Sequence, residues 1–160
     1  MTRLTEWIRT PRRRGWKRLT AYGLIGLVVI IQAVPYGRSH SNPPVTAGPQ
    51  WDTPRTEALF MRACGDCHSN LTKWPWYTNV APASWLVQMD VDGGRDALNL
   101  SQLDSTQLEI GEIAEVIREG GMPPWQYTLI HRGAGLSDQE KADLIRGLTA
   151  TLSRPPVAGP

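Results

Sequence analysis

The chain has 160 residues, which is enough for one domain of ordinary size, and a formal net charge of +2. Its two cysteines, Cys64 and Cys67, lie too close together to cross-link distant parts of a fold, which excludes a disulfide scaffold. Residues 1–38 carry eight Lys/Arg and one Glu, whereas the remainder carries nine Lys/Arg and fourteen Asp/Glu. This acidic body disfavours a nucleic-acid-binding role, which needs a basic face on the folded part.

The N-terminal part is organised like a membrane anchor. A basic segment, residues 1–18, precedes a mostly apolar segment, residues 19–36. At 1.5 Å per residue the apolar segment would span roughly 27 Å, just short of a hydrocarbon core of about 30 Å. We expect an uncleaved transmembrane anchor, with a cleaved signal peptide as the alternative. In either case the rest of the chain lies outside the cytoplasm, which for a bacterial inner-membrane protein is the periplasm.

Residues 37–50 are rich in proline and predict an extended linker, and residues 153–160 predict a similar tail. Between them, residues 51–152 predict an all-α domain, because no run of alternating apolar residues indicates a strand. Four helices are expected in this domain. The first follows an N-cap at Asp52 or Thr53, and the second covers about 83–91 and stops at Gly93-Gly94. The third covers 110–119 and stops at Gly120-Gly121, and the fourth opens with a capping box of Ser137 and Glu140.

Four short helices joined by long loops make a thin core for a domain of about 100 residues, so an apolar ligand is expected to complete it. The tryptophans of this region would suit the walls around a flat aromatic ligand, although for any single tryptophan packing in the core is the commoner role. These tryptophans are Trp51, Trp74, Trp76, Trp85 and Trp125.

The segment CGDCH, residues 64–68, contains both cysteines and one of the three histidines of the chain. A structural zinc site needs four ligands, and beyond Cys64, Cys67 and His68 the domain offers only His131. A thioredoxin-like redox pair expects a βαβ context, which the sequence lacks. Covalent attachment of haem requires a histidine directly after the second cysteine, and this requirement is met.

The spacing within this segment suits haem attachment. Cysteines three positions apart lie about one helical turn apart, so their two sulfurs can meet the vinyl groups on neighbouring pyrroles of one porphyrin. The imidazole of His68 would then approach the iron from the same side. The sequence therefore predicts one covalently attached haem c, held by Cys64 and Cys67, with His68 as an iron ligand.

The longer sequence around this motif has a family resemblance. The segments CGDCHSNLTKWPWYTNVAPASWLVQMDVDGGRDALNLS and GGMPPWQYTLIH resemble the bacterial haem-binding domain family, over roughly residues 51–152. Members of this family are small cytochrome-c-like proteins, usually found behind one N-terminal hydrophobic segment. The resemblance implies an all-α monohaem fold and a role in haem binding or electron transfer, with no established catalytic reaction.

Two residues compete for the second axial position of the iron. Met122 follows the helix stop Gly120-Gly121 and precedes Pro123-Pro124, which favour a stiff, extended loop. We therefore predict Met122 as the ligand opposite His68, and His131 is the alternative.

Other candidates receive structural or peripheral roles. Met61 and Met89 lie within helical patterns and are expected to fill the core. Arg95 could pair with a haem propionate or lie solvated on the surface. His40 lies in the linker and receives no role in the site.

The leading function is that of an electron carrier tethered to the membrane on its periplasmic side. The acidic body, made more negative by haem propionates, suggests a redox partner protein with a basic docking patch. One alternative is a peroxidase-like haem enzyme, which needs an open sixth position on the iron. Another is a haem-based sensor, in which a gas displaces Met122.

Overall fold

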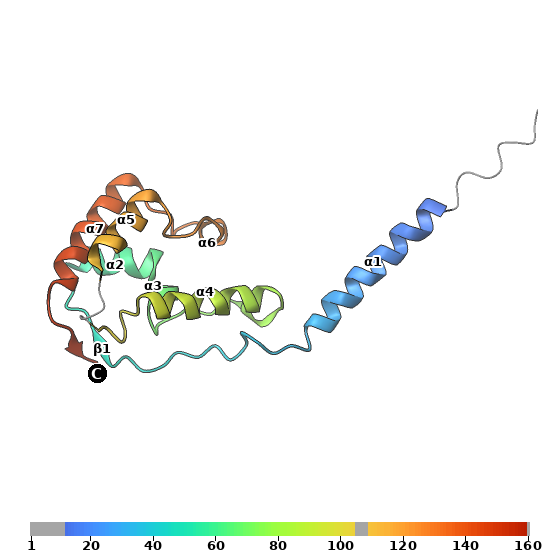
Figure 1. Ribbon diagram of the computed structural model, residues 1–160, viewed down its shortest axis with the longest axis horizontal. Helices are drawn as coiled ribbons and strands as arrows, with labels where there is room; N and C mark the ends of the chain where they lie inside the picture. Colours follow the sequence, from blue (N-terminus) through green and yellow to red (C-terminus); the bar gives the residue numbers. More distant parts are fainter. Residues whose placement is uncertain (1–11, 105–108, 160) are drawn as a thin grey trace, which may run out of the picture.

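The computed structural model describes residues 12–104 and 109–159, with side chains from residue 15 onward, so most of the basic segment 1–18 lies outside the described residues. The prediction of an all-α domain is confirmed, because the described part is mostly helical (Figure 1). Its helices are α1 (Arg12–Ile31), α2 (Pro54–Ala63), α3 (Gly65–His68), the 3-10 helix η1 (Trp76–Asn79), α4 (Ala83–Ala97), α5 (Ile110–Glu119), α6 (Trp125–Ile130) and α7 (Asp138–Leu152).

Three of the four predicted helices begin or end at the expected residues. The side chain of Thr53 caps α2 by accepting the N–H of Thr56. Helix α7 begins with the predicted capping box, in which Ser137 and Glu140 each bind the other's backbone N–H. Helix α5 ends at Gly120, whose φ of +79° is the left-handed conformation that favours glycine. These boundaries follow from local sequence alone.

The predicted end of α4 is wrong. The helix does not stop at Gly93-Gly94 but continues to Ala97. A Cβ placed on Gly94 would lie 2.6 Å from the carbonyl oxygen of Cys67, so this glycine lets α4 pack directly against α3. Tertiary packing therefore outweighs the low helix propensity of two adjacent glycines.

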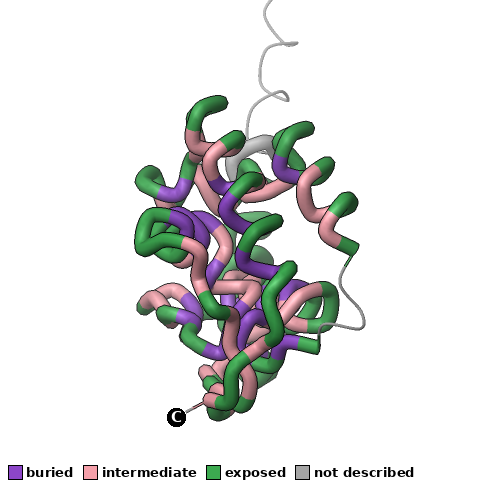
Figure 2. The backbone as a smooth tube through the Cα atoms, turned by 90° about the vertical axis from the view of Figure 1, so that its left-hand side faces the viewer, coloured by how far each residue is buried: buried purple, intermediate pink, exposed green. Residues whose placement is uncertain are grey.

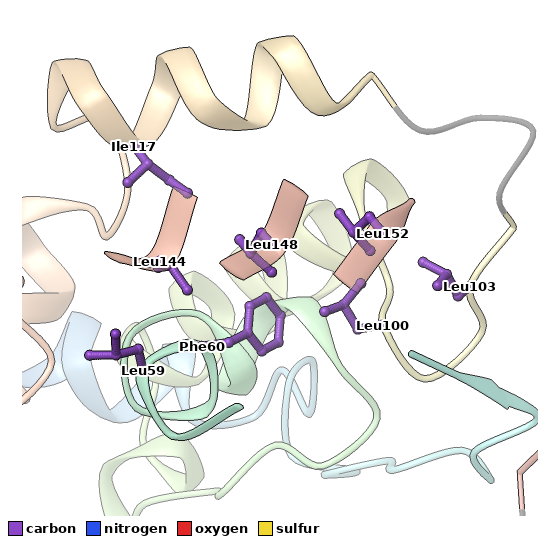
Figure 3. Close-up of a cluster of buried hydrophobic side chains, with 8 residues drawn as sticks. All are labelled: Leu59, Phe60, Leu100, Leu103, Ile117, Leu144, Leu148 and Leu152. Atoms are coloured by element: carbon purple, nitrogen blue, oxygen red, sulfur yellow. The ribbon is translucent and has the colours of Figure 1, made fainter. Parts of the chain in front are cut away.

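The main core lies between α2, α5 and α7. Figure 3 shows the ring of Phe60 below Leu148 of α7 and beside Leu100. Buried positions lie among exposed ones along the domain, as Figure 2 shows in purple and green. The buried apolar cluster consists of Leu59, Phe60, Leu100, Leu103, Ile117, Leu144, Leu148 and Leu152.

Helix α1 differs at both ends from the transmembrane segment predicted over 19–36. It starts at Arg12 and ends at Ile31, after which residues 32–33 form a turn. Its apolar part after Arg18 is therefore shorter than expected, and at 1.5 Å per residue it extends about 20 Å. Within residues 12–104 and 109–159, no helix combines the length and the apolar character needed to cross a membrane.

The linker packs along the domain instead of hanging free. The N–H of Thr46 donates to the carbonyl of Ser101 at 2.9 Å, and the N–H of Leu103 donates to that of Ala47 at 3.0 Å. Strand β1 (Ala47–Gly48) in the linker pairs antiparallel with strand β2 (Val157–Ala158) in the predicted tail. The backbone groups of both segments thus find partners within the domain.

The side chain of Gln32 helps to fasten the end of α1 to the domain. The amide of Gln32 donates through Nε2 to the carbonyl of Ala81 at 2.9 Å and accepts the N–H of Ala81 through Oε1 at 3.0 Å. Close by in the chain, Gly37 has a φ of +77°, and a Cβ there would lie 2.1 Å from the carbonyl oxygen of Ser84. The chain after α1 is therefore held against the beginning of α4.

Candidate functional site

The CGDCH segment forms the short helix α3, directly after α2. Cys64 is both the C-cap of α2 and the N-cap of α3. Its carbonyl accepts the N–H groups of Cys67 and His68 at 3.1 and 2.9 Å. Both cysteines and the histidine thus belong to one helical turn, as the sequence predicts. Neither cysteine forms a disulfide.

The imidazole of His68 has a defined tautomer. Its Nδ1 lies 3.1 Å from the carbonyl oxygen of Leu98, and because a carbonyl oxygen can only accept, Nδ1 carries the proton. Burial lowers the pKa of His68 below its usual value, so the ring stays neutral at neutral pH. Nε2 is then the nitrogen with a free lone pair, which is the state a metal ligand requires.

Two neighbouring cavities open beside α3. The first has a volume of about 250 Å³ and the second about 230 Å³. They share four lining residues, which come from the α2–α3 junction, α3, α4 and the loop after α5: Cys64, His68, Ala97 and Met122. Each is somewhat smaller than the roughly 300 Å³ of a typical ligand pocket. Cys67 also lines the first cavity.

The two cysteines are partly buried. Burial raises the pKa of Cys64 to about 12 and that of Cys67 to about 11. Both thiols are therefore protonated at neutral pH and are not reactive as thiolates without activation.

The residues present fit a haem. The donor set of one neutral imidazole and one thioether, from His68 and Met122, is a combination that c-type haem iron accepts. The walls leave room for a flat ring, because Ala63 and Ala97 are small and a Cβ on Gly93 would meet no described atom within 4 Å. Both thiols line the same cavity as these donors.

Met122 lies in a tight loop after α5. The N–H groups of Gly121 and Met122 both donate to the carbonyl of Val116, at 2.9 and 3.4 Å, and the Met122–Pro123 peptide bond is cis. The side chain of Met122 is half-buried and borders both cavities. The structure therefore brings the predicted axial candidate Met122 to the same cavities as His68.

The alternative candidate, His131, does not line either of the two cavities beside His68, although its own cavity shares Cys67, Asp90 and Tyr127 with the first of them. It lines a third cavity of about 160 Å³ between η1, α4 and α6, together with Cys67 but without His68. Its Nε2 lies 3.2 Å from the hydroxyl of Tyr77, and its ring lies 4.2 Å from that of Tyr127. The four residues considered for a zinc site are thus not gathered around one cavity, and among the described residues no cluster of three or more His, Cys, Asp or Glu could hold a metal ion.

Several expectations about residues near the site are corrected. Among the described residues, no tryptophan lines either of the two cavities beside His68. Met89 is not core filling, because it is 59% exposed and borders the first cavity, whereas Met61 packs against the core as predicted. Arg95 serves the scaffold, and it donates to four acceptors: the carbonyls of Ser69 and Ser41, Oδ1 of Asn42 and Oγ1 of Thr72.

Sequence reasoning missed two contacts that position the site. One is the carbonyl of Leu98, which becomes available to His68 only because α4 runs on past its glycines. The other is Tyr127 in α6, whose hydroxyl donates to Oδ2 of Asp66 at 2.7 Å. Asp66 lies inside CGDCH, so this bond joins the helix after Met122 to the turn that carries His68. No short-range pattern indicates either contact.

Comparison with known proteins gives one family and one distant relative. The family model described as "Haem-binding domain" matches residues 26–150, which include the end of α1 and the whole linker. Over 95 residues the chain is 26% identical to "Cytochrome c peroxidase Ccp" of Escherichia coli (strain K12), a match that covers 54% of the chain and 20% of that protein. The chain thus spans about a fifth of the length of this relative. No solved structure matches the chain.

Proposed function

The chain belongs to the haem-binding domain family, and on this premise we propose that it is a membrane-tethered monohaem protein of the c type that transfers electrons on the periplasmic side. One observation carries the proposal: Cys64, His68 and Met122 border the same two cavities. A bound haem supplies one-electron exchange at its iron. The protein's residues attach it, ligate it and control the access of water and partners.

Cys64 and Cys67 are the residues that attach the haem covalently. Each cysteine would hold the haem through one thioether bond, which its thiol would form by adding its sulfur and its proton to the two carbons of one vinyl group. Because both thiols line the first cavity and neither is used in a disulfide, both are free for this addition. The two thioether bonds would hold the porphyrin against α3.

His68 and Met122 are the proposed axial ligands. The bond from Nδ1 of His68 to Leu98 keeps the proton on the nitrogen remote from the metal and raises the basicity of Nε2. Met122 offers a thioether from a loop whose two N–H groups are tied to Val116. With both positions filled, the iron has no vacancy for catalysis, which favours electron transfer over peroxidase chemistry.

Exchange of electrons needs a route from the cavity to the surface. Met89 borders the first cavity and is 59% exposed, so the cavity reaches the surface beside α4. The body after residue 38 carries fourteen acidic and nine basic side chains. A redox partner protein with a basic docking patch would therefore be steered to it, in an encounter that weakens as salt is added.

Helix α1 is the proposed membrane tether. Its successive positions Leu27, Val28, Val29 and Ile30 are each more than half exposed, so the helix presents apolar side chains on every side. A helix of this kind suits insertion into lipid better than lying on its surface. Because its apolar part is short, the long side chains of Lys17 and Arg18 would reach toward the headgroups.

The proposal is tested with the full chain after haem attachment. We expect optical spectra of a six-coordinate, low-spin iron in both redox states, reversible one-electron reduction, and electron exchange with a basic partner protein that slows as ionic strength rises. The competing function is the peroxidase activity that the name of the E. coli relative describes. High-spin ferric iron together with turnover of hydrogen peroxide would favour that function and contradict ours.

A further inference from the structure

One end of the domain exposes a group of large apolar side chains. Two of them are tryptophans, Trp76 at 79% exposed and Trp125 at 73%, although tryptophan is among the most buried residues on average. The group, which we call the apolar end face, consists of Trp76 in η1, Leu86 and Met89 in α4, and Trp125, Leu129 and Ile130 in α6; each is at least 59% exposed.

These residues form one face because the three elements that carry them meet. Leu86 of α4 and Ile130 of α6 line the same cavity. Tyr77 lines it too, and its ring lies 6.0 Å from that of Trp76. Leu86 and Met89 are three positions apart on α4 and so share one side of that helix. The elements that carry the apolar end face, η1, α4 and α6, are therefore neighbours.

The apolar end face lies on the side of the domain from which α1 departs. In Figure 1, α6 and the beginning of α4 lie at the end of the domain nearest α1, and β2 lies at the opposite end. The two hydrogen bonds between Gln32 and Ala81 hold the end of α1 next to the beginning of α4. Val34 and Val80, which flank this junction, are themselves 47% and 45% exposed.

We propose that the apolar end face docks on the surface of the lipid bilayer into which α1 inserts, with Trp76 and Trp125 at the level of the headgroups. The inference rests on the proposed tether, because α1 is what brings this end of the domain to the membrane. Tryptophan suits the lipid–water boundary, since its ring is apolar and its N–H is polar. The leucine and isoleucine side chains of α4 and α6 would then enter the region just below the headgroups.

The bilayer is favoured over a protein partner by the connection within the chain itself. A helix with apolar side chains all round and a domain end with six exposed apolar side chains are joined through Gln32 and the residues that follow it, so lipid that surrounds the first lies beside the second. Gln32 acts as a positioning residue in this arrangement, since its paired hydrogen bonds set the domain against the end of α1.

The test is hydroxyl-radical footprinting of the full-length haem-loaded protein in lipid nanodiscs that hold one copy each, read residue by residue by mass spectrometry. We expect Trp76, Trp125 and Leu129 to be oxidised several-fold more slowly than their exposure predicts, whereas Val157 on β2, 44% exposed, reacts at the expected rate. Leu129→Glu should restore oxidation of Trp125, and the matched control Val157→Glu should leave its protection unchanged. Gln32→Ala should also restore oxidation while the protein stays in the disc.

The outcomes separate this proposal from the tether on which it rests. If the protein does not co-float with lipid vesicles, the tether fails and docking fails with it. If the protein co-floats but Trp76 and Trp125 react at the rate of free side chains, the tether stands and docking is overturned. Protection that develops only with two copies per disc would assign the face to a second copy of the chain, and protection that needs an added redox protein would assign it to that partner; both results overturn the proposal.

Discussion

His68 donates its Nδ1–H to the carbonyl of Leu98 at 3.1 Å, and Leu98 is the first residue beyond α4. In return, the carbonyl of His68 accepts the N–H of Leu100 at 2.9 Å. The end of α4 and the turn that carries the proposed iron ligand therefore fix each other. This arrangement requires α4 to pass through its glycines, since a helix that stopped at Gly93 would not deliver the Leu98 carbonyl to the imidazole.

We predict that Gly94→Ala loosens the site. The added Cβ would lie 2.6 Å from the oxygen and 2.8 Å from the Cβ of Cys67, so α4 has to move away from α3. Overpacking of this kind costs about 1–3 kcal/mol in the free energy of unfolding. Chemical denaturation of the haem-loaded protein measures this loss, and we also expect a lower yield of attached haem.

Gly111→Ala is the matched control, because Gly111 also lies inside a helix, α5, and a Cβ there meets nothing within 4 Å among the described residues. That change should stabilise the protein by up to about 1 kcal/mol through helix propensity alone. Equal effects of the two substitutions would show that α4 and α3 are not in close contact.

Covalent attachment is predicted to depend on both cysteines. Cys64→Ser and Cys67→Ser should each leave a haem held by a single thioether, with weaker haem staining on a denaturing gel and a shifted absorption maximum in the reduced state. The double variant should lose staining entirely, because no sulfur remains to bond to a vinyl group. Full staining of the double variant would refute the assignment.

A pH dependence is expected from the capping box of α7. Two hydrogen bonds lower the pKa of Glu140 below its ordinary value of 4.5. The larger effect comes from the backbone N–H of Ser137, and the next comes from Arg62, which donates to Glu140 at 2.7 Å. A lowered pKa in the folded state stabilises the protein above about pH 4.5, and this stabilisation is lost as the pH falls through the lowered value.

Glu140→Gln should therefore make the melting temperature less dependent on pH below about pH 5. Melting curves of the variant and the wild type between pH 3 and pH 7 measure the difference. Glu115→Gln, which removes an exposed carboxylate on α5 that lines neither cavity beside His68, is the control for net charge. An unchanged slope in Glu140→Gln would mean that the box does not contribute to acid sensitivity.

The elements that the sequence predicts correctly are those set by local chemistry. The Thr53 cap, the Ser137 capping box and the Gly120 stop each depend on residues within one turn, and all three are confirmed. The motif CGDCH likewise carries its own geometry, because one helical turn places its thiols and imidazole together. Local rules therefore suffice for these parts of the fold and the site.

What the sequence does not predict depends on contacts between distant segments. From the sequence, Gly93-Gly94 predicts the end of a helix, but in the structure Gly94 lies within α4 and packs against Cys67. The sequence also predicts a free linker, but in the structure the linker pairs with Ser101 and with β2. The hydrogen bond from Tyr127 to Asp66 depends on the position of α6 beside α3, which no local pattern indicates. In each case tertiary structure reverses or adds to a local preference.

The sharpest prediction concerns the second iron ligand. Met122 borders the same cavities as His68, whereas His131 lines a different cavity and has its Nε2 engaged with the hydroxyl of Tyr77. Met122→Ala should therefore convert the iron to a high-spin state or admit a substitute ligand. It should also lower the reduction potential, because a thioether favours ferrous iron more than imidazole or water does. Absorption spectra and redox titration of the haem-loaded protein measure both effects.

His131→Ala is the discriminating control, and it should leave the spectrum and the potential nearly unchanged because its ring contacts only Tyr77 and Tyr127 among the aromatic residues described. Met122→His separates ligation from loop folding, since a new imidazole at the same position should restore a low-spin iron at a lower potential than the wild type. If His131→Ala opens the iron while Met122→Ala stays six-coordinate, the two assignments are exchanged. If the wild type and all three variants are high-spin, the sixth position is open and the protein is better suited to react with peroxide than to carry electrons.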